Sequence, residues 1–186
     1  MKLVLASTSP RRHELLGRLG VPFEIADPGQ VEGPHGPPGP LARARWAAAE
    51  KARAVAAGRR EAVVLGADTM ISVGGRALGK PADEEDARRM LRLLSDRTHA
   101  VYSAVHVVGP VGREAAGHSR SLLTLRRLRE ADIERYLGYG ESLDKAGAYS
   151  IQGHGEELLV RRVGPLDNVI GLPLAVVRRL LSRVAA

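Results

Sequence analysis

Apolar residues along this chain fall into two patterns that alternate irregularly. Short runs of aliphatic and β-branched residues predict buried or half-buried strands, whereas apolar residues that recur every three or four positions predict amphipathic helices. Longer loops are expected at residues 28–40 and 164–173. Strands are expected at residues 2–6, 22–26, 63–68, 98–109, 119–128 and 158–163, and helices at residues 10–19, 41–57, 83–96, 129–141 and 174–184.

Turn and cap residues support these boundaries. Ser9 and Pro10 suit the cap and the first position of the first helix, and Gly20 suits its end. Asp83 suits the cap of the third helix, and Gly140 is expected to stop the fourth. Because strands and helices mix without strict alternation, we expect an α/β fold with a mixed sheet.

The stretch from residue 63 to residue 81 brings an acid and a base onto one short hairpin. Asp68 is expected at the end of a buried strand, and Gly74 and Gly75 then turn the chain back. Lys80 follows, just before a proline. The pattern predicts that the carboxylate and the ammonium lie close together on rigid backbone, where they would face a substrate or a metal ion.

The first strand leads through a turn rich in hydroxyl groups into the first helix. Free backbone N–H groups and the positive end of the helix dipole meet at such a point, which makes it a recurrent anion-binding arrangement. Arg11 and Arg12 lie in the first helical turn, where cations are normally unfavourable. An anion bound between the two arginines would explain them, and the alternative is an exposed basic helix start.

Residues 28–40 contain five prolines and four glycines and are expected to form neither helix nor strand. A loop of this length inside a compact domain is more often a lid or a binding loop than an inert linker. Glu32 is its only carboxylate, and the residues alone predict a solvated side chain there.

Composition narrows the class of protein. The length of the chain predicts a single domain over residues 1–186. Its hydrophobic share of 44% predicts a sizeable core. Aromatic residues make up only 3%, which leaves little for stacking on single-stranded nucleic acid. The absence of cysteine excludes disulfides, thiolate metal ligands and cysteine nucleophiles. Because neither a signal peptide nor a long apolar span is recognisable, we expect a cytoplasmic protein outside the membrane.

The net charge of +7 favours an anionic partner: nucleotide, nucleic acid or acidic lipid. One interpretation is therefore a basic module that binds nucleic acid or a protein partner. Only four of the 28 basic residues are lysines, and a compact ammonium suits a point contact to phosphate, although chance would also explain so small a number. The four are Lys2, Lys51, Lys80 and Lys145.

Several familiar motifs are missing from the chain. It contains no GxGxxG fingerprint, no GxxxxGK[ST] loop, no HExxH pair and no GxSxG elbow. What remains is a few carboxylates with lysines and arginines around loops of small residues. That set suits a hard, oxygen-bound Mg²⁺ or Mn²⁺ ion together with a phosphorylated substrate.

Six motifs, in this order and spacing, resemble the Maf family of nucleotide pyrophosphatases: STSPRR, EKA, GADT, GKP, DKAGAYSIQG and NVIGLPL. The resemblance covers nearly the whole chain and is weakest over residues 28–40. It implies a mixed, curved α/β fold like that of inosine triphosphate pyrophosphatases, with a cleft between two lobes. It also implies metal-dependent hydrolysis of nucleoside triphosphates to the monophosphate and pyrophosphate.

Within that family, DKAGAYSIQG is similar to the branch that acts on dTTP and UTP and often tolerates modified pyrimidines. The branch that acts on 7-methyl-GTP typically has a different block there. Members of the family are also described as inhibitors of septum formation, and homodimers are common among them. The resemblance therefore implies an enzyme of nucleotide metabolism with a nucleoside triphosphate as its partner, and no nucleic acid.

The motifs also imply roles for individual residues. Asp68 and Lys80 match the catalytic positions, Asp68 as proton acceptor and metal ligand. Glu32 matches a second acidic position for the Mg²⁺ or Mn²⁺ ion, although QVEGP here replaces the acidic run usual in the family. The positions that bind the phosphates or the base match Ser7, Arg11, Arg12, Lys51, Thr69, Lys145 and Gln152.

Overall fold

The computed structural model describes residues 2–29, 31 and 36–185. Within these residues, seven strands form one sheet in the order β2-β1-β3-β5-β6-β7, with β4 paired to β3. The strands are β1 (Lys2–Ala6), β2 (Phe23–Ala26), β3 (Ala62–Val73), β4 (Arg76–Leu78), β5 (Thr98–Val108), β6 (Glu114–Leu125) and β7 (Leu159–Val163). The helices are α1 (Pro10–Gly17), α2 (Pro40–Ala56), α3 (Glu84–Leu94), α4 (Glu130–Leu137), α5 (Leu166–Ile170) and α6 (Leu174–Ala185), with short 3-10 turns η1 (Pro110–Gly112), η2 (Ala146–Ala148) and η3 (Gly153–Leu158).

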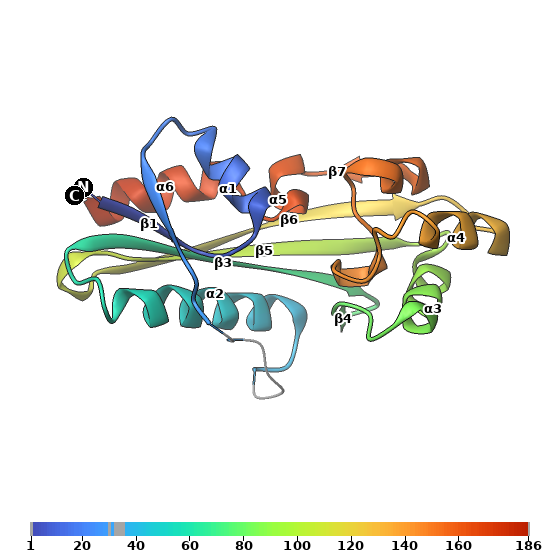
Figure 1. Ribbon diagram of the computed structural model, residues 1–186, viewed down its shortest axis with the longest axis horizontal. Helices are drawn as coiled ribbons and strands as arrows, with labels where there is room; N and C mark the ends of the chain where they lie inside the picture. The colour runs from blue at the N-terminus through green and yellow to red at the C-terminus, as the bar shows by residue number, and fades with distance from the viewer. Residues whose placement is uncertain (1, 30, 32–35, 186) are drawn as a thin grey trace.

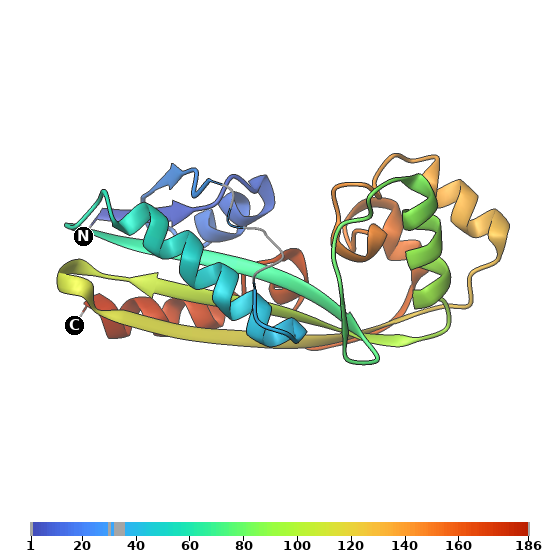
Figure 2. The same ribbon diagram turned by 90° about the horizontal axis from the view of Figure 1, so that it is seen from below.

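The sheet is mixed, which confirms the predicted fold class. β1 is parallel to both β2 and β3, whereas β3, β5, β6 and β7 pair antiparallel in turn. The long strands β3, β5 and β6 run the length of an elongated molecule (Figure 1). They connect a lobe that holds both chain ends to a lobe that holds α3 and α4, and the two lobes are separate in the second view (Figure 2).

In the lobe that holds the chain ends, α1 and α6 cover one face of the sheet and α2 covers the other (Figure 1). The α1 and α6 face is built from leucine and valine side chains, such as Leu15, Leu65 and Val177. On the other face, most of the buried side chains of α2 are alanines, so this helix packs close to β3. A Cβ atom on Gly66 would lie only 2.2 Å from the carbonyl oxygen of Ala48, so glycine is required at that position.

In the other lobe, α3 and α4 lie side by side (Figure 2) and bury their apolar faces on the far ends of β3, β5 and β6. The cap of α3 is as expected: the Asp83 side chain accepts a hydrogen bond from the backbone N–H of Asp86 at 2.8 Å. The outer faces of α3 and α4 are joined by ion pairs, in which Arg88 meets Glu134 and Arg92 meets Glu130.

Several predicted boundaries are wrong. β3 continues five residues past Asp68 because its pairing with β5 extends to Ser72, so Asp68 lies within the strand and not at its end. β6 begins at Glu114, earlier than expected, because its first residues pair with β5 although they are small or polar. The helices predicted to reach residues 19 and 141 end at Gly17 and Leu137, and the predicted loop at 164–173 contains α5.

The helices bear on the prediction that no segment spans a membrane. Among the residues that the structure describes, no helix has both the length and the apolar character that a bilayer crossing would need.

Candidate active site

A gap along one edge of β3 creates the candidate site. β1 pairs with β3 up to Gly66, and β4 pairs with it from Ile71 onward. Among the described strands, residues 67–70 therefore pair only with β5, on their other edge. The parallel strands β1 and β2 also end here, and ligands in open α/β sheets commonly bind beyond the carboxyl ends of parallel strands. A cleft of about 1100 Å³ opens at this point and runs between the two lobes.

Asp68 lies at the base of the cleft, on the α2 face of β3. Its side chain is 5% exposed, and its Oδ1 atom accepts a hydrogen bond at 2.7 Å from the ammonium of Lys51, which is 7% exposed. The second oxygen, Oδ2, is buried and accepts no hydrogen bond from the described part of the chain. Buried carboxylate oxygens normally have a partner, so Oδ2 is an available acceptor for a water or a cation.

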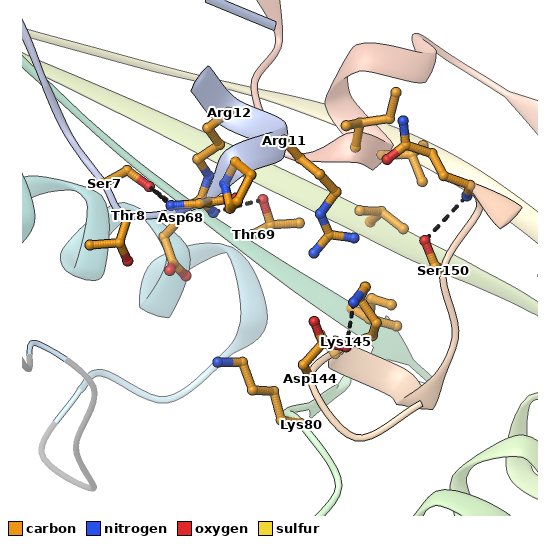
Figure 3. A pocket seen from close by; sticks show the side chains of 18 of the residues that line it. Ser7, Thr8, Arg11, Arg12, Asp68, Thr69, Lys80, Asp144, Lys145 and Ser150 are labelled. Carbon is orange, nitrogen blue, oxygen red and sulfur yellow. Dashed lines mark hydrogen bonds and ion pairs between the residues drawn. The ribbon is translucent and has the colours of Figure 1, made fainter. Parts of the chain in front are cut away.

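The ion-pair partner of Asp68 is therefore Lys51, which comes from α2, and not Lys80 from the hairpin. The close packing of α2 at Gly66 explains the pairing, because it brings the next turn of the helix against the same face of β3. Lys80 does line the same cleft, but its exposed side chain makes no ion pair with the described residues. Figure 3 shows Lys80 and Arg11 extending into the cleft from opposite sides.

The turn between β1 and α1 forms one wall. Ser7 is buried, and its Oγ atom accepts hydrogen bonds from the Ser9 backbone N–H at 3.2 Å and from the guanidinium of Arg12 at 3.4 Å. Ser9 is the N-cap residue and Pro10 begins α1, as predicted, but the Ser9 side chain makes no capping hydrogen bond. The first turn of α1 has no acidic residue, so the positive end of its dipole is not neutralised from within the helix.

The two arginines of this turn differ in how they are held. Several groups hold Arg12: its Nε atom donates to the carbonyl of Gly171 at 3.1 Å, and its terminal nitrogens donate to Ser7 and to Thr69. Arg11 extends into the cleft (Figure 3) and makes no hydrogen bond with the residues that the structure describes. One guanidinium is thus oriented by the fold, while the other can adapt to a ligand.

The opposite wall comes from the DKAGAYSIQG segment. Lys145 and Gln152 both line the cleft, as does Asp144, whose pKa is lowered mainly by its hydrogen bond to the Lys145 ammonium. The backbone N–H of Gly147 donates to the carbonyl of Gly79 at 2.9 Å. This bond ties the loop that carries Lys80 to the segment that carries Lys145, so motifs far apart in the sequence share one wall.

The Gly/Pro-rich loop borders the site in part. Pro28, Gly29 and Val31 line the cleft, which agrees with the prediction of a binding loop. Glu32 lies outside the described residues, so its predicted role as a metal ligand stays a prediction. In the described part of the chain, no group of three or more His, Asp or Glu side chains could hold a metal ion.

Two residues at the site were missed by sequence reasoning. Glu141 lines the cleft, and its Oε2 atom is buried without a hydrogen-bond partner in the described chain. Asn168 is fully buried behind the cleft and contacts two strands. Glu141 carries no signal, because it lies at a predicted helix end. Asn168 lies in a segment expected to be a loop, and its signal is its place as the first residue of the NVIGLPL motif.

Comparison with known proteins places the chain in a family. The family model described as Maf-like protein matches residues 2–184, which include all six motifs. The chain belongs to the Maf-like family. Over 182 residues this family member is 52% identical to the dTTP/UTP pyrophosphatase of Moorella thermoacetica, covering 97% of this chain and 94% of that protein. It is 47% identical to the dTTP/UTP pyrophosphatase of Deinococcus radiodurans over 180 residues, covering 97% and 91%.

Solved structures agree on the fold. The Staphylococcus aureus Ham1 protein superposes with a TM-score of 0.54 over 100% of this chain and 96% of its own, at 16% sequence identity. Because the identity is so low, this likeness speaks to the fold alone. It confirms the architecture that the sequence resemblance implied for this Maf-like chain.

Proposed function

We propose that this protein is a nucleoside triphosphate pyrophosphatase that hydrolyses dTTP and UTP, and tolerates modified pyrimidine nucleotides, releasing the monophosphate and pyrophosphate. The names of its relatives support the substrate class. The observation that carries the proposal is the Asp68 carboxylate, buried and paired on one oxygen, with its other oxygen available in a cleft lined by cations. A phosphate-rich substrate complements such a cleft.

Positive charge in the cleft would bind the triphosphate. Arg11, Lys80 and Lys145 line it from three different segments, and the N-terminus of α1 adds its dipole. A forked guanidinium suits two phosphate oxygens at once, while each ammonium acts as a point charge. Because these groups are already in place, charge that develops on the departing pyrophosphate would be stabilised without rearrangement of solvent.

Asp68 would act on the attacking water. A carboxylate within hydrogen-bond reach of a water can orient it and accept its proton, and such positioned base catalysis contributes about 10²- to 10⁴-fold in rate. The Lys51 ammonium at 2.7 Å keeps the other carboxylate oxygen engaged, so the side chain cannot rotate freely. The proton acceptor would thereby be held in one orientation for a water that attacks the α-phosphorus.

The residues also fit a divalent cation. The Asp68 Oδ2 atom is a hard, buried oxygen without a hydrogen-bond donor in the described residues. Mg²⁺ is usually held by one or two carboxylates together with substrate phosphates and waters, so Asp68 with Glu32 as a second ligand would suffice. When bound there, Mg²⁺ or Mn²⁺ would polarise the triphosphate and lower the pKa of a bound water.

The decisive experiment locates the bond that breaks. The protein is incubated with dTTP or UTP and Mg²⁺ in ¹⁸O-labelled water, and the products are separated and weighed by mass spectrometry. We expect monophosphate that carries the label and unlabelled pyrophosphate, since the attack is on the α-phosphorus. Orthophosphate with the diphosphate would overturn the proposal, because it requires attack at the γ-phosphorus.

A substrate panel then tests the choice of base. Normal and modified nucleoside triphosphates are compared with Mg²⁺ and with Mn²⁺, and the highest kcat/KM is expected for pyrimidine substrates. The inactive variant Asp68→Asn serves as control for contaminating phosphatases. The same variant, overproduced in cells, tests whether an effect on septum formation depends on catalysis: division arrest by the inactive variant would separate the two properties.

A further inference from the structure

Asn168 of α5 is 0% exposed and uses its whole amide group to hold α5 against the sheet. Its Oδ1 atom accepts from the Ser103 backbone N–H at 3.2 Å, and its Nδ2 atom donates to the Val101 carbonyl at 3.1 Å and to the Ser121 hydroxyl at 2.9 Å. The amide therefore locks α5 to β5 and to β6 at once. Neither Asn168 nor Ser103 lines the cleft.

The hydroxyl of Ser103 extends this contact toward the cleft. It donates its single hydrogen to the backbone carbonyl of Asn168 at 2.7 Å, because a carbonyl can only accept. The Ser103 and Thr69 hydroxyls lie 2.8 Å apart, across directly paired positions of β5 and β3. With its own hydrogen already committed, Ser103 can only accept from Thr69.

The direction of the Thr69 hydroxyl follows from this. Its hydrogen points at Ser103, so its lone pairs are left to accept from the guanidinium of Arg12, whose Nη2 atom lies at 3.4 Å. The other contact of Arg12 on this side is the carbonyl of Gly171, directly after α5. Gly171 has a φ of 128°, a backbone conformation that residues other than glycine rarely adopt, and it lies against Thr69. Two of the acceptors that hold Arg12, the Thr69 hydroxyl and the Gly171 carbonyl, thus depend on how α5 is docked.

We propose that Ser103 and Asn168 are positioning residues for the phosphate-binding arginine. Ser103 sets the polarity of the Thr69 hydroxyl, and Asn168 sets the place of Ser103 and of the Gly171 carbonyl, so that the guanidinium of Arg12 keeps one plane. The inference rests on the proposed function, and on the phosphate-binding role that the STSPRR motif implies for Arg12, which lines the cleft. It assigns a role to the NVIGLPL motif, which contributes no charged group to the cleft.

A matched pair of buried serines tests the proposal. Ser103 and Ser121 both contact Asn168 and both are buried, but only Ser103 reaches Thr69, since Ser121 donates to the Pro165 carbonyl instead. Ser103→Ala and Ser121→Ala should lower the melting temperature by similar amounts. We expect kcat to fall about tenfold in Ser103→Ala with KM changed less than about twofold, and to stay within about twofold of wild type in Ser121→Ala.

A double-mutant cycle with Thr69→Val shows whether Ser103 acts through Thr69. In the Thr69→Val background, Ser103→Ala should cause no further loss of kcat, because the group it orients is gone. Equal losses of kcat in the two serine variants would overturn the proposal, as would a tenfold loss that persists in the Thr69→Val background.

A measurement without turnover separates this inference from the proposed function. The Nε–H signal of Arg12 is assigned by its loss in Arg12→Lys, and its ¹⁵N relaxation is compared among variants. It should report a rigid side chain in wild type and Ser121→Ala, and a mobile one in Ser103→Ala. Equal rigidity in both serine variants would overturn the inference, whereas a wild-type protein inactive on every triphosphate would overturn only the proposed function.

Discussion

At the scale of single residues, the site depends on the Asp68 carboxylate, of which the described residues engage one oxygen and not the other. Lys51 engages Oδ1 of Asp68 at 2.7 Å and leaves Oδ2 to a ligand. Removing one partner of a buried ion pair typically costs about 3–5 kcal/mol, because the other charge is left uncompensated. The pair therefore contributes to both stability and chemistry, and substitutions have to be designed to separate the two.

Asp68→Asn removes the proton acceptor but keeps an oxygen that can accept from Lys51. We expect kcat to fall by about 10²- to 10⁴-fold, the usual contribution of a positioned general base. Turnover is measured by pyrophosphate release and the fold by near-ultraviolet circular dichroism. Activity within about tenfold of wild type, in a folded variant, would contradict the role of Asp68 as proton acceptor.

Lys80→Ala should weaken turnover without weakening the fold. Its side chain is exposed and makes no ion pair with the described residues, so stability should change by less than about 0.5 kcal/mol. We expect a loss of at least about tenfold in kcat/KM. Lys2→Ala is the matched control, since Lys2 is also exposed but pairs with Glu24 on the outer strand β2. A parallel loss of melting temperature in Lys80→Ala would indicate a structural ion pair instead.

The buried imidazole of His99 predicts how the stability of the fold depends on pH. The side chain is 2% exposed, and burial lowers its pKa to about 4 from an unfolded value of 6.5. Between those values the unfolded chain takes up a proton that the native protein does not, so stability is complete above about pH 6.5 and falls as the pH drops toward 4. The full difference amounts to about 3 kcal/mol.

His99→Gln keeps a polar partner for the Tyr149 hydroxyl, which lies 2.6 Å from the imidazole. Urea unfolding at pH 7.5 and pH 4.5 should show a smaller loss of stability in the variant than in wild type. His154→Gln, at a half-exposed histidine, is the control and should behave as wild type. Identical pH slopes for wild type and His99→Gln would show that the imidazole is protonated in the native state.

At the scale of elements, the contact of α2 with β3 decides where Lys51 lies. Gly66→Ala would place a methyl group 2.2 Å from the carbonyl of Ala48, so the helix must shift outward. We expect a cost of about 1–3 kcal/mol from overpacking, together with a loss of kcat because Lys51 moves off Asp68. Thermal unfolding measures the loss of stability, and turnover measures the loss of kcat.

The control for that substitution is Gly58→Ala, which introduces the same methyl group after the end of α2. No atom lies within 4 Å of the added Cβ there, and the backbone is not in the left-handed region. Its stability and kcat should match wild type. If Gly66→Ala lowers stability but leaves kcat unchanged, the placement of α2 is not what aligns the catalytic pair.

Segment boundaries show how pairing overrides local pattern. The run of small apolar and β-branched residues at 63–68 predicted a strand, but its continuation to Val73 follows from pairing with neighbouring strands. The first residues of β6 have no strong apolar pattern, and they are strand because the antiparallel partner β5 continues opposite them. Helix α5 is too short for a periodic signal, and it is held by tertiary contacts of Asn168.

At the scale of the whole molecule, the charge of +7 has to be reconciled with a small anionic substrate. Many arginines are already engaged in ion pairs on the surface, such as Arg88 and Arg92 between α3 and α4. The cations of the cleft, such as Arg11 and Lys80, differ from these arginines because they all line the same cleft. The distribution favours a nucleotide over an extended polyanion.

Salt dependence distinguishes the two kinds of partner. A protein that binds nucleic acid through six to ten phosphates loses about 10³- to 10⁵-fold in affinity between 50 and 200 mM salt. We expect kcat/KM for the triphosphate to change far less, by about tenfold at most, because one substrate presents few phosphates. A steep loss of affinity for arbitrary DNA or RNA over that range would instead support a nucleic-acid-binding module.

The sequence alone determined the class of fold and the candidate residues. Period-two and period-3.6 patterns specify strands and helices locally, and the motifs named Ser7, Arg12, Asp68 and Lys145, all of which border one cleft. Only the tertiary structure decided which distant residues form hydrogen bonds and ion pairs with one another. Lys51 and Asp68 are 17 residues apart, and Arg12 and Gly171 are 159 apart. Such pairs depend on register and packing between distant elements, which no local pattern encodes. The same holds for the open edge of β3, which exists because β1 ends before β4 begins.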